Sequence, residues 1–191
     1  MGPSSFTVIY DACLLFSAAR RDLFMHLAMS GLFRARWTAE IQEEWIEALI
    51  AHRPDLDRAR LSRTRDLMNE FAPDSEVVGY QSLIKGLKLP DPDDRHVLAA
   101  AIRCGASEII TFNLKDFPDS ELASFNIQAR HPDEFAASLV DLSAPAVVAA
   151  ARDQRRDLTD PELSVEQFLE NLRRAELPRT ASKLAAYSNL L

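Results

Sequence analysis

Six residues that are far apart in the chain have the side-chain types of ligands for a hard metal ion. They are Asp11, Glu44, Asp91, Asp94, Asn113 and Asp116. Packed carboxylates repel one another, and Mg²⁺ or Mn²⁺, which prefer oxygen ligands, relieve that repulsion. Two such ions about 3.5–4 Å apart can activate water and stabilise the leaving oxygen of a phosphodiester. The chemistry open to this set is therefore metal-assisted hydrolysis.

Two predicted strands end at members of this set. The run Phe6–Tyr10 is β-branched and aromatic, which is typical of a buried strand, and Asp11 follows it directly. A second strand, 108–111, leads into Asn113 and Asp116. Ligands of open α/β sheets bind outside the carboxyl ends of the strands. We therefore expect these side chains at one edge of a sheet.

Asp91 and Asp94 stand at the start of the clearest predicted helix. Asp91 has the chemistry of an N-cap, Pro92 suits the first helical position, and Gly105 is a stop signal. This helix would precede the strand at 108–111, so its first turn could approach the same edge of the sheet.

Glu44 shares its predicted helix with Glu40, Glu43 and Glu47. The apolar stripe of this helix consists of Ile41, Trp45, Ala48 and Leu49. At about 100° per residue, Glu44 borders the stripe, whereas the other three glutamates are displaced outward. The periodicity therefore predicts that Glu44 alone faces inward.

Each acid also has a purely structural explanation. Asp91 could be only an N-cap, and Asp94 could only complement the helix dipole. Asp116 could be a turn residue, and Glu44 a solvated helix residue. Asp11 is the hardest to explain in this way, because a buried-type strand rarely runs straight into an acid. At the level of single residues these alternatives stay open.

Strands alternate with helices from residue 6 to 142, which predicts a parallel sheet with right-handed crossovers. The predicted strands are 6–10, 33–37, 75–80, 108–111 and 125–129, and the main helices are 12–30, 38–52, 55–71, 91–105 and 132–142. Beyond Pro145 only helical segments remain, at 145–157, 164–176 and 179–190. We expect an α/β domain over 1–143 and a small all-α appendage over 144–191.

The composition narrows the class of protein. The 191 residues are 47% hydrophobic and 27% charged, which suits one soluble domain with an appendage. The net charge of −7 argues against indiscriminate nucleic-acid binding but not against local contacts. Cys13 and Cys104 lack disulfide or zinc spacing, so we expect reduced thiols in the cytoplasm. No signal peptide or membrane span is expected.

Four segments follow one another in a characteristic order. They are Val8–Leu15 (VIYDACLL), Thr38–Trp45 (TAEIQEEW), Pro90–Ala101 (PDPDDRHVLAAA) and Ile109–Phe117 (IITFNLKDF). The third is the most specific. Together, over roughly residues 6 to 140, they resemble the motifs of the PIN domain family, which includes the toxins of VapBC toxin–antitoxin systems.

The resemblance implies a PIN-like parallel sheet flanked by helices and a ribonuclease that uses Mg²⁺ or Mn²⁺. The implied metal ligands and catalytic residues are Asp11, Glu44, Asp94 and Asp116, with Asp91 and Asn113 assisting. The implied partners are an RNA substrate and a cognate antitoxin protein, and a homodimer stays open. The chain departs from the family pattern at Asn113, where some members carry Asp, and at Cys13, where a polar residue is common.

Two other classes of protein fit these residues less well. A phosphatase of the haloacid dehalogenase type would need a second Asp where Cys13 stands. A nucleotide-binding protein would need a Gly-rich loop, and the chain has only five glycines. A PIN-like module that binds RNA or protein without cutting stays open. His96 is expected on a helix surface, and Trp37 and Trp45 are expected in the core.

The C-terminal helices carry apolar faces that must be buried somewhere. These faces include Val147, Val148, Ala151, Phe168, Leu169, Leu172 and Leu184. They could pack on the α/β domain, or they could accept an amphipathic helix from an inhibitor protein. The sequence leaves both alternatives open.

Overall fold

The computed structural model describes residues 6–159 and 161–191 and divides the chain into two compact units. The first unit contains residues 6–16 and 33–130, and the second contains residues 17–32 and 131–191. The second unit therefore includes a segment from the N-terminal half of the chain. Its C-terminal segment begins at residue 131, upstream of the predicted boundary at 143.

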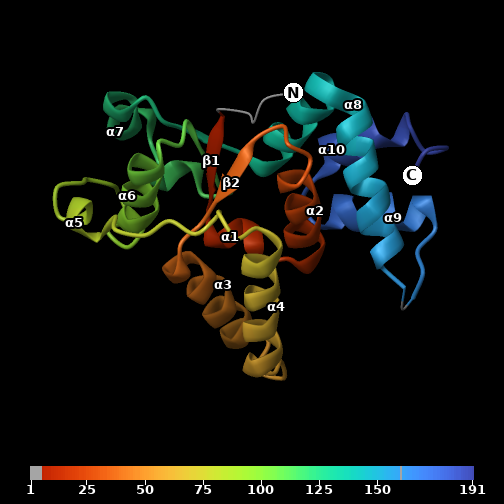
Figure 1. The fold of residues 1–191 in the computed structure, drawn as a ribbon, viewed down its shortest axis with the longest axis horizontal. Coiled ribbons are helices and arrows are strands. Elements are labelled where there is room, and N and C mark those ends of the chain that lie inside the picture. The colour runs from red at the N-terminus through yellow and green to blue at the C-terminus, as the bar shows by residue number, and fades with distance from the viewer. Residues whose placement is uncertain (1–5, 160) are drawn as a thin grey trace. The chain divides into compact units, whose positions relative to one another are not determined.

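A four-stranded parallel sheet forms the centre of the first unit (Figure 1). Its strands are β1 (Thr7–Tyr10), β2 (Arg34–Arg36), β3 (Glu108–Ile110) and β4 (Gln128–Arg130), in the order β2-β1-β3-β4. Ile9 pairs with Arg36 on one side and with Ile109 on the other. All four residues of β1 are buried, as expected for a strand that is covered on both faces.

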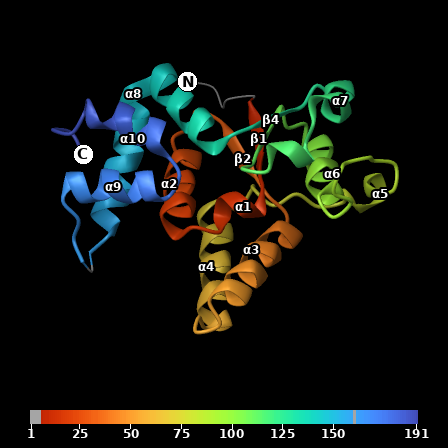
Figure 2. The same ribbon diagram turned by 180° about the vertical axis from the view of Figure 1, so that it is seen from behind.

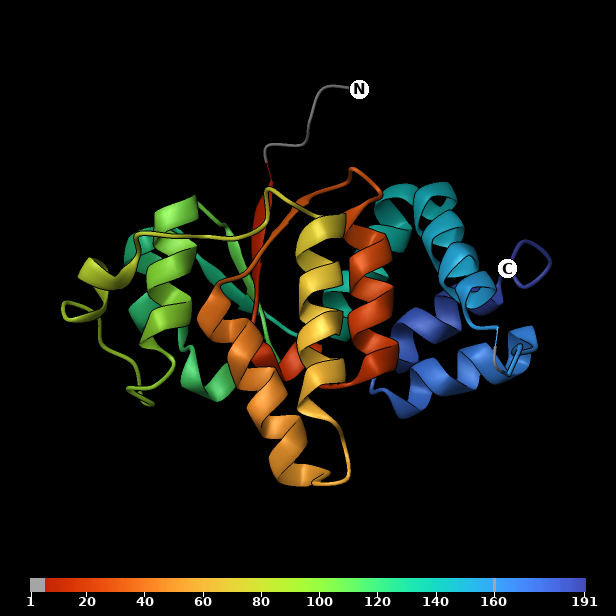
Figure 3. The same cartoon turned by 60° about the horizontal axis from the view of Figure 1, so that its bottom comes forward.

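Helices flank this sheet. They are α1 (Ala12–Leu15), α3 (Ala39–His52), α4 (Arg58–Phe71), α5 (Gln81–Ile84), α6 (Arg95–Cys104) and α7 (Asp119–Leu122), with short 3₁₀ turns at Leu114–Asp116 and Ala123–Phe125. The helix α6 packs on β1 and β3, and α3 lies beside α4 (Figure 3). Thr38 caps α3 by accepting a hydrogen bond from Ile41 N at 3.0 Å, and Gly105 ends α6 in the left-handed conformation.

The core of the first unit contains both tryptophans, as predicted. Trp37 and Trp45 are fully buried, and the ring of Trp37 stacks on that of Tyr10 with centroids 6.1 Å apart. Each indole N–H has a partner: Trp37 donates to Asn69 Oδ1 and Trp45 to Gln42 Oε1. These hydrogen bonds offset the free-energy cost of burying the two polar N–H groups in the core.

Three sequence predictions are wrong in detail. The expected strand at 75–80 is reduced to a single bridge between Trp37 and Glu76, because Gly79 adopts a φ of +74° and turns the chain. The helix expected from Asp91 begins at Arg95, because the Asp91 side chain accepts a hydrogen bond from Asp93 N and holds a turn. The expected last strand at 125–129 occurs at Gln128–Arg130.

The helix expected at 12–30 is divided into α1 and α2 (Ala18–Ala28), and α2 belongs to the second unit. The other helices of that unit are α8 (Pro132–Asp157), α9 (Val165–Arg174) and α10 (Pro178–Ala185) (Figure 2). A kink at Ser143, two residues before Pro145, divides α8 where the sequence predicts a break between two helices. The predicted helical segments at 145–157 and 164–176 are confirmed, whereas the third, predicted at 179–190, ends at Ala185.

The apolar faces of the C-terminal helices are buried. Phe168, Leu172 and Leu184 are almost fully buried, α10 packs on α8 and α9, and α2 packs on α8. The rings of Phe24 on α2 and Phe135 on α8 stack with centroids 6.2 Å apart. A segment from the N-terminal half of the chain thus completes the core of this helical unit.

Among the described residues, α8 is the one helix that is long and apolar enough to cross a membrane. Its most apolar window has a mean hydropathy of 1.4, and half of that window is buried inside the protein. Buried core helices of soluble proteins pass the same test, so α8 gives weak evidence for a membrane span.

Asp133, near the start of α8, holds the start of α10. Its buried carboxylate accepts hydrogen bonds from Arg179 N, Thr180 N and Thr180 Oγ1, each at 2.8 Å. Replacement of Asp133 by Ala would leave these donors unpaired, so we expect the free energy of unfolding to fall by about 1–3 kcal/mol. Chemical denaturation measures the change. Glu134→Ala, at an exposed ion pair, is the matched control and should cost under about 1 kcal/mol. Equal losses for the two variants would contradict this role for Asp133.

Candidate active site

The predicted acids lie around the carboxyl ends of β1 and β3, the two central strands. In the strand order β2-β1-β3-β4, the chain after β1 continues to β2 on one side of β1. The chain after β2 returns to β3 on the other side of β1, so the strand order reverses between β1 and β3. Open α/β sheets bind ligands at such a switch point, outside the carboxyl ends of the strands. Asp11 follows β1 there, and the segment after β3 carries Asn113 and Asp116.

Asp11 is the most enclosed carboxylate of the site, with 5% of its surface exposed. Its Oδ1 accepts a hydrogen bond from Ala12 N at 2.7 Å at the start of α1. Its Oδ2 accepts from Thr111 Oγ1 at 2.6 Å and from Cys13 Sγ at 3.0 Å. These donors fix the orientation of the carboxylate and stabilise its charge.

Cys13 therefore has a polar role that its position in the first motif did not predict. Burial, reinforced by the charge of Asp11 and the hydrogen bond to it, raises the pKa of the Cys13 thiol to about 12. The thiol stays protonated at neutral pH and can donate to Asp11. Phe112 N donates to the sulfur at 3.3 Å, which ties the start of α1 to the end of β3.

Asp94 lies at the N-terminal end of α6 and is the electrostatic centre of the site. Partial burial, followed by the charges of Asp11, Asp91, Asp116 and Glu44, raises the pKa of Asp94 to about 7. The structure therefore brings these five acids together closely enough for their charges to interact. The Oδ2 atom of Asp94 is buried and has no hydrogen-bond partner among the described residues.

The side chain of Glu44 contacts a histidine on α6. Its Oε1 lies 2.9 Å from Nε2 of His96, and Glu40 Oε2 lies 3.6 Å from Nδ1 of the same ring. His96 is 4% exposed, so its prediction as a surface residue is wrong. Burial disfavours the charged imidazole, but Glu44, Glu40 and Asp11 outweigh it and raise the pKa of His96.

The four glutamates of α3 divide differently from the prediction. Glu43 and Glu47 contact Arg58 on α4 and face away from the site. Glu40, which was expected to point outward, accepts a hydrogen bond from Tyr80 at 2.9 Å and lies on the same side as Glu44. The spacing of four residues between Glu40 and Glu44 could have indicated that the two share a side of α3, because residues four apart are neighbours on a helix.

The remaining predicted residues lie at the rim of the site. Asp91 and Asn113 are exposed, and Asp116 is partly exposed at the end of a 3₁₀ turn. Asn113 N donates to Thr111 Oγ1 at 2.9 Å, so Thr111 connects the segment after β3 to Asp11. Sequence reasoning missed Thr111, although its place beside the first acid follows from the pairing of β1 with β3.

The chemistry of the site suits a divalent cation. Every predicted ligand offers oxygen atoms, four acids act on Asp94, and one buried oxygen of Asp94 lacks a donor. Within residues 6–159 and 161–191, no three acidic, His or Cys side chains are already arranged closely enough to hold a metal ion. The residues fit a divalent cation by donor type and by charge.

Comparisons with known proteins agree with this fold. Residues 7–115 match the family model described as PIN domain, and residues 132–186 match the model described as VapC50 C-terminal domain. The chain belongs to the PIN domain family. The first match contains five of the six predicted site residues and ends one position before Asp116.

A relative from Mycobacterium tuberculosis (strain ATCC 25618 / H37Rv) carries the name "Putative ribonuclease VapC50". It is 38% identical over 105 residues, which cover 55% of this chain and 61% of the relative. The chain thus aligns with less than two thirds of that protein's length. No solved structure matches the chain.

The raised pKa of Asp94 predicts how stability depends on pH without metal. An acid whose pKa rises on folding, here from 3.8 to about 7, makes the free energy of unfolding fall as pH rises between those values. Asp94→Asn removes this penalty. In chelator, we expect Asp94→Asn to raise the melting temperature by on the order of 5 °C at pH 8 and by about 1–2 °C at pH 4.

Calorimetric scans at the two pH values measure this difference. Asp93→Asn, at an exposed neighbouring position, is the control for loss of one negative charge. If Asp94→Asn gains no more stability at pH 8 than at pH 4, burial and the four acids do not raise the pKa of Asp94 as described.

Proposed function

We propose that the protein is an Mg²⁺- or Mn²⁺-dependent endoribonuclease that hydrolyses RNA phosphodiester bonds. The observation that carries the proposal is Asp94 at the switch point of the sheet, whose pKa is raised by partial burial and then by the charges of four other acids. Such a concentration of negative charge is costly unless a cation binds there. The PIN domain match and the printed name of the relative support RNA as the substrate.

The side chains divide the work of the reaction. Asp11, held by Ala12 N and Thr111, offers a fixed carboxylate at the floor of the site, and Asp94 and Glu44 offer two more. Asp116 offers a fourth acid at the rim. A bound divalent cation would supply Lewis acidity and lower the pKa of a water molecule.

The protein residues then position the attack. Carboxylates orient the water and accept its proton, and the water oxygen forms a bond to phosphorus as the bond to the 3′ oxygen breaks. The 3′ oxygen takes up a proton, which leaves a 5′-phosphate on the downstream fragment. Asn113 and Asp91 at the rim would assist by hydrogen bonding.

An acidic site also needs positive charge around it to hold RNA. Lys115 is exposed on the 3₁₀ turn that carries Asp116, and Lys85 and Lys88 are exposed on the segment between α5 and Asp91. Flexible lysines can contact phosphates without specifying sequence. Local contacts of this kind, together with bound cations, reconcile RNA binding with a net charge of −7.

We further propose that the protein is the toxin of a type II toxin–antitoxin pair. The matches to the PIN domain and VapC50 C-terminal domain models support this, because they cover both units of the chain. A ribonuclease of this kind requires a cognate antitoxin protein to protect the cell that makes it. Cytoplasmic location is part of the same proposal.

Matched substitutions on α3 test the catalytic assignment. Glu44→Gln removes an acid that faces the site, whereas Glu47→Gln removes one that faces Arg58 on α4. With Mn²⁺ and a labelled RNA, we expect Glu44→Gln, Asp11→Asn and Asp94→Asn to lower the cleavage rate by about 100-fold or more. Glu47→Gln should cleave at nearly the wild-type rate.

Far-ultraviolet circular dichroism shows whether each variant is folded. The assignment fails if folded Asp11→Asn and Asp94→Asn variants cleave at the wild-type rate. If the wild-type protein binds RNA but cleaves none with either metal, the non-enzymatic PIN-like module is the better description.

Metal binding should also stabilise the folded protein without any substrate. A ligand that binds only the native state raises stability by mass action, so Mn²⁺ at about 100 times its Kd should raise the melting temperature by about 5–10 °C. Asp11→Asn should lose most of that rise. A wild-type melting temperature that does not respond to millimolar Mn²⁺ would contradict a metal site.

A further inference from the structure

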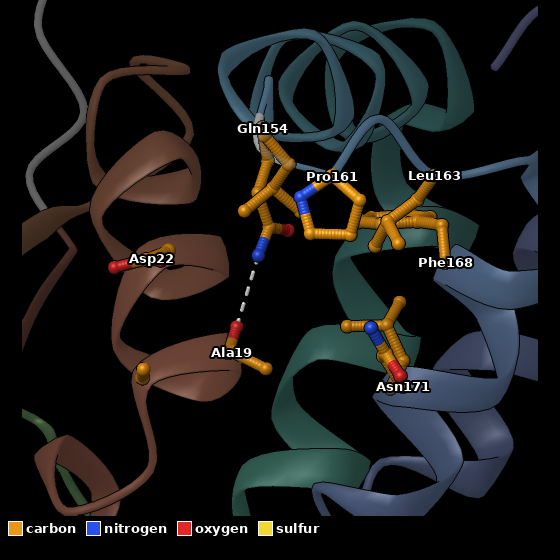
Figure 4. Close-up of a pocket in the computed structure, with 10 residues that line it drawn as sticks. Ala19, Asp22, Gln154, Pro161, Leu163, Phe168 and Asn171 are labelled. Atoms are coloured by element: carbon orange, nitrogen blue, oxygen red, sulfur yellow. Dashed lines mark hydrogen bonds between the residues drawn. The ribbon is translucent and has the colours of Figure 1, made fainter.

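A cavity of about 350 Å³ lies within the second unit, where α2, α8, α9 and the segment around Pro161 border one space (Figure 4). Its wall is largely apolar, because seven of the ten residues that line it are Ala18, Ala19, Leu158, Pro161, Leu163, Phe168 and Leu172. Small-molecule sites in proteins typically have volumes of about 300–1,000 Å³ and apolar walls with few polar groups. The cavity has the size and character of such a site.

Gln154 on α8 is the polar group that sets the chemistry of this pocket. It is 2% exposed, and its Nε2 donates a hydrogen bond to the backbone oxygen of Ala19 at 3.0 Å (Figure 4). That contact fixes the orientation of the amide, because a flipped amide would place two oxygen atoms together. The Oε1 atom is buried and has no hydrogen-bond partner within residues 6–159 and 161–191.

An unpaired buried acceptor costs free energy, and most buried polar atoms in proteins are paired. Gln154 lines the pocket, so a molecule bound there can supply the missing donor. Asn171 on α9 and Asp22 on α2 also line the space, but Figure 4 shows the carboxyl group of Asp22 turned away from Gln154. The acceptor that needs a partner is thus a neutral amide.

We propose that this pocket binds a small, neutral, mostly apolar molecule that donates one hydrogen bond to Gln154 Oε1. The apolar wall takes up the body of the molecule, and the amide oxygen selects a molecule with an N–H or O–H group. Each residue that lines the pocket belongs to the second unit, whereas the carboxylates of the candidate active site belong to the first. The proposal therefore does not depend on the ribonuclease activity.

Indole and 1-methylindole are matched probes for this site. They share one ring system, but the N-methyl group removes the donor and adds apolar surface. Ligand-detected NMR titration of the full-length protein gives both dissociation constants. We expect indole to bind at millimolar or lower concentration and roughly three- to tenfold more tightly than 1-methylindole, despite its smaller apolar surface.

Two substitutions place the binding in the pocket. Gln154→Met removes the acceptor and should abolish the preference for indole, while 1-methylindole still binds. Ala18→Trp, at an exposed residue that lines the pocket, should block both probes. Ala186→Trp, at an exposed alanine of the same unit outside the pocket, is its matched control and should leave binding unchanged.

The outcomes separate clearly. If neither probe binds the wild-type protein, the space holds only water and the proposal is overturned. Equal binding of the two probes would refute the role of Gln154 Oε1, and binding that survives Ala18→Trp would place the probes elsewhere. Should Gln154→Met fail to fold, the two probes on the wild-type protein and the Ala18 variant still decide the question.

Discussion

Repulsion among carboxylates at the carboxyl ends of β1 and β3 is the constraint on which the candidate site depends. Asp11 is anchored there, because Ala12 N, Thr111 and Cys13 all donate hydrogen bonds to its carboxylate. Asp94 lacks such donors at its buried oxygen, and its pKa rises to about 7. The protein thus holds one carboxylate that is anchored by three donors and one that has an unpaired buried oxygen, and a cation would relieve the repulsion between their charges.

Much of this site could be predicted from the sequence. Two sequence features indicated acids that the topology brings together. One is the buried-type strand that ends at Asp11, and the other is the polar segment before α6, which contains Asp94. His96, Glu40 and Thr111 were missed, for a common physical reason. Their roles depend on contacts between elements, α3 with α6 and β1 with β3, and helical periodicity describes only the faces of one element at a time.

The fold shows the same limit. The alternation of strands and helices predicted the parallel sheet, and Pro145 predicted the kink in α8. The sequence did not predict that α2 joins the C-terminal helices, because an amphipathic helix buries its apolar face equally well against any partner of suitable shape. A strand was also predicted at 75–80, where Gly79 permits a turn that local β propensity does not reveal.

Diffraction from crystals soaked in Mn²⁺ tests the central claim most directly, since anomalous scattering locates the ion itself. The charge distribution predicts an anomalous peak at the carboxyl ends of β1 and β3, with Asp11 and Asp94 among its oxygen ligands. Asp11→Asn crystals soaked in the same way should show a weak peak or none. The claim would be contradicted by a strong anomalous peak only at another place in wild-type crystals. It would also be contradicted if fully soaked wild-type crystals showed no peak at the carboxyl ends of β1 and β3.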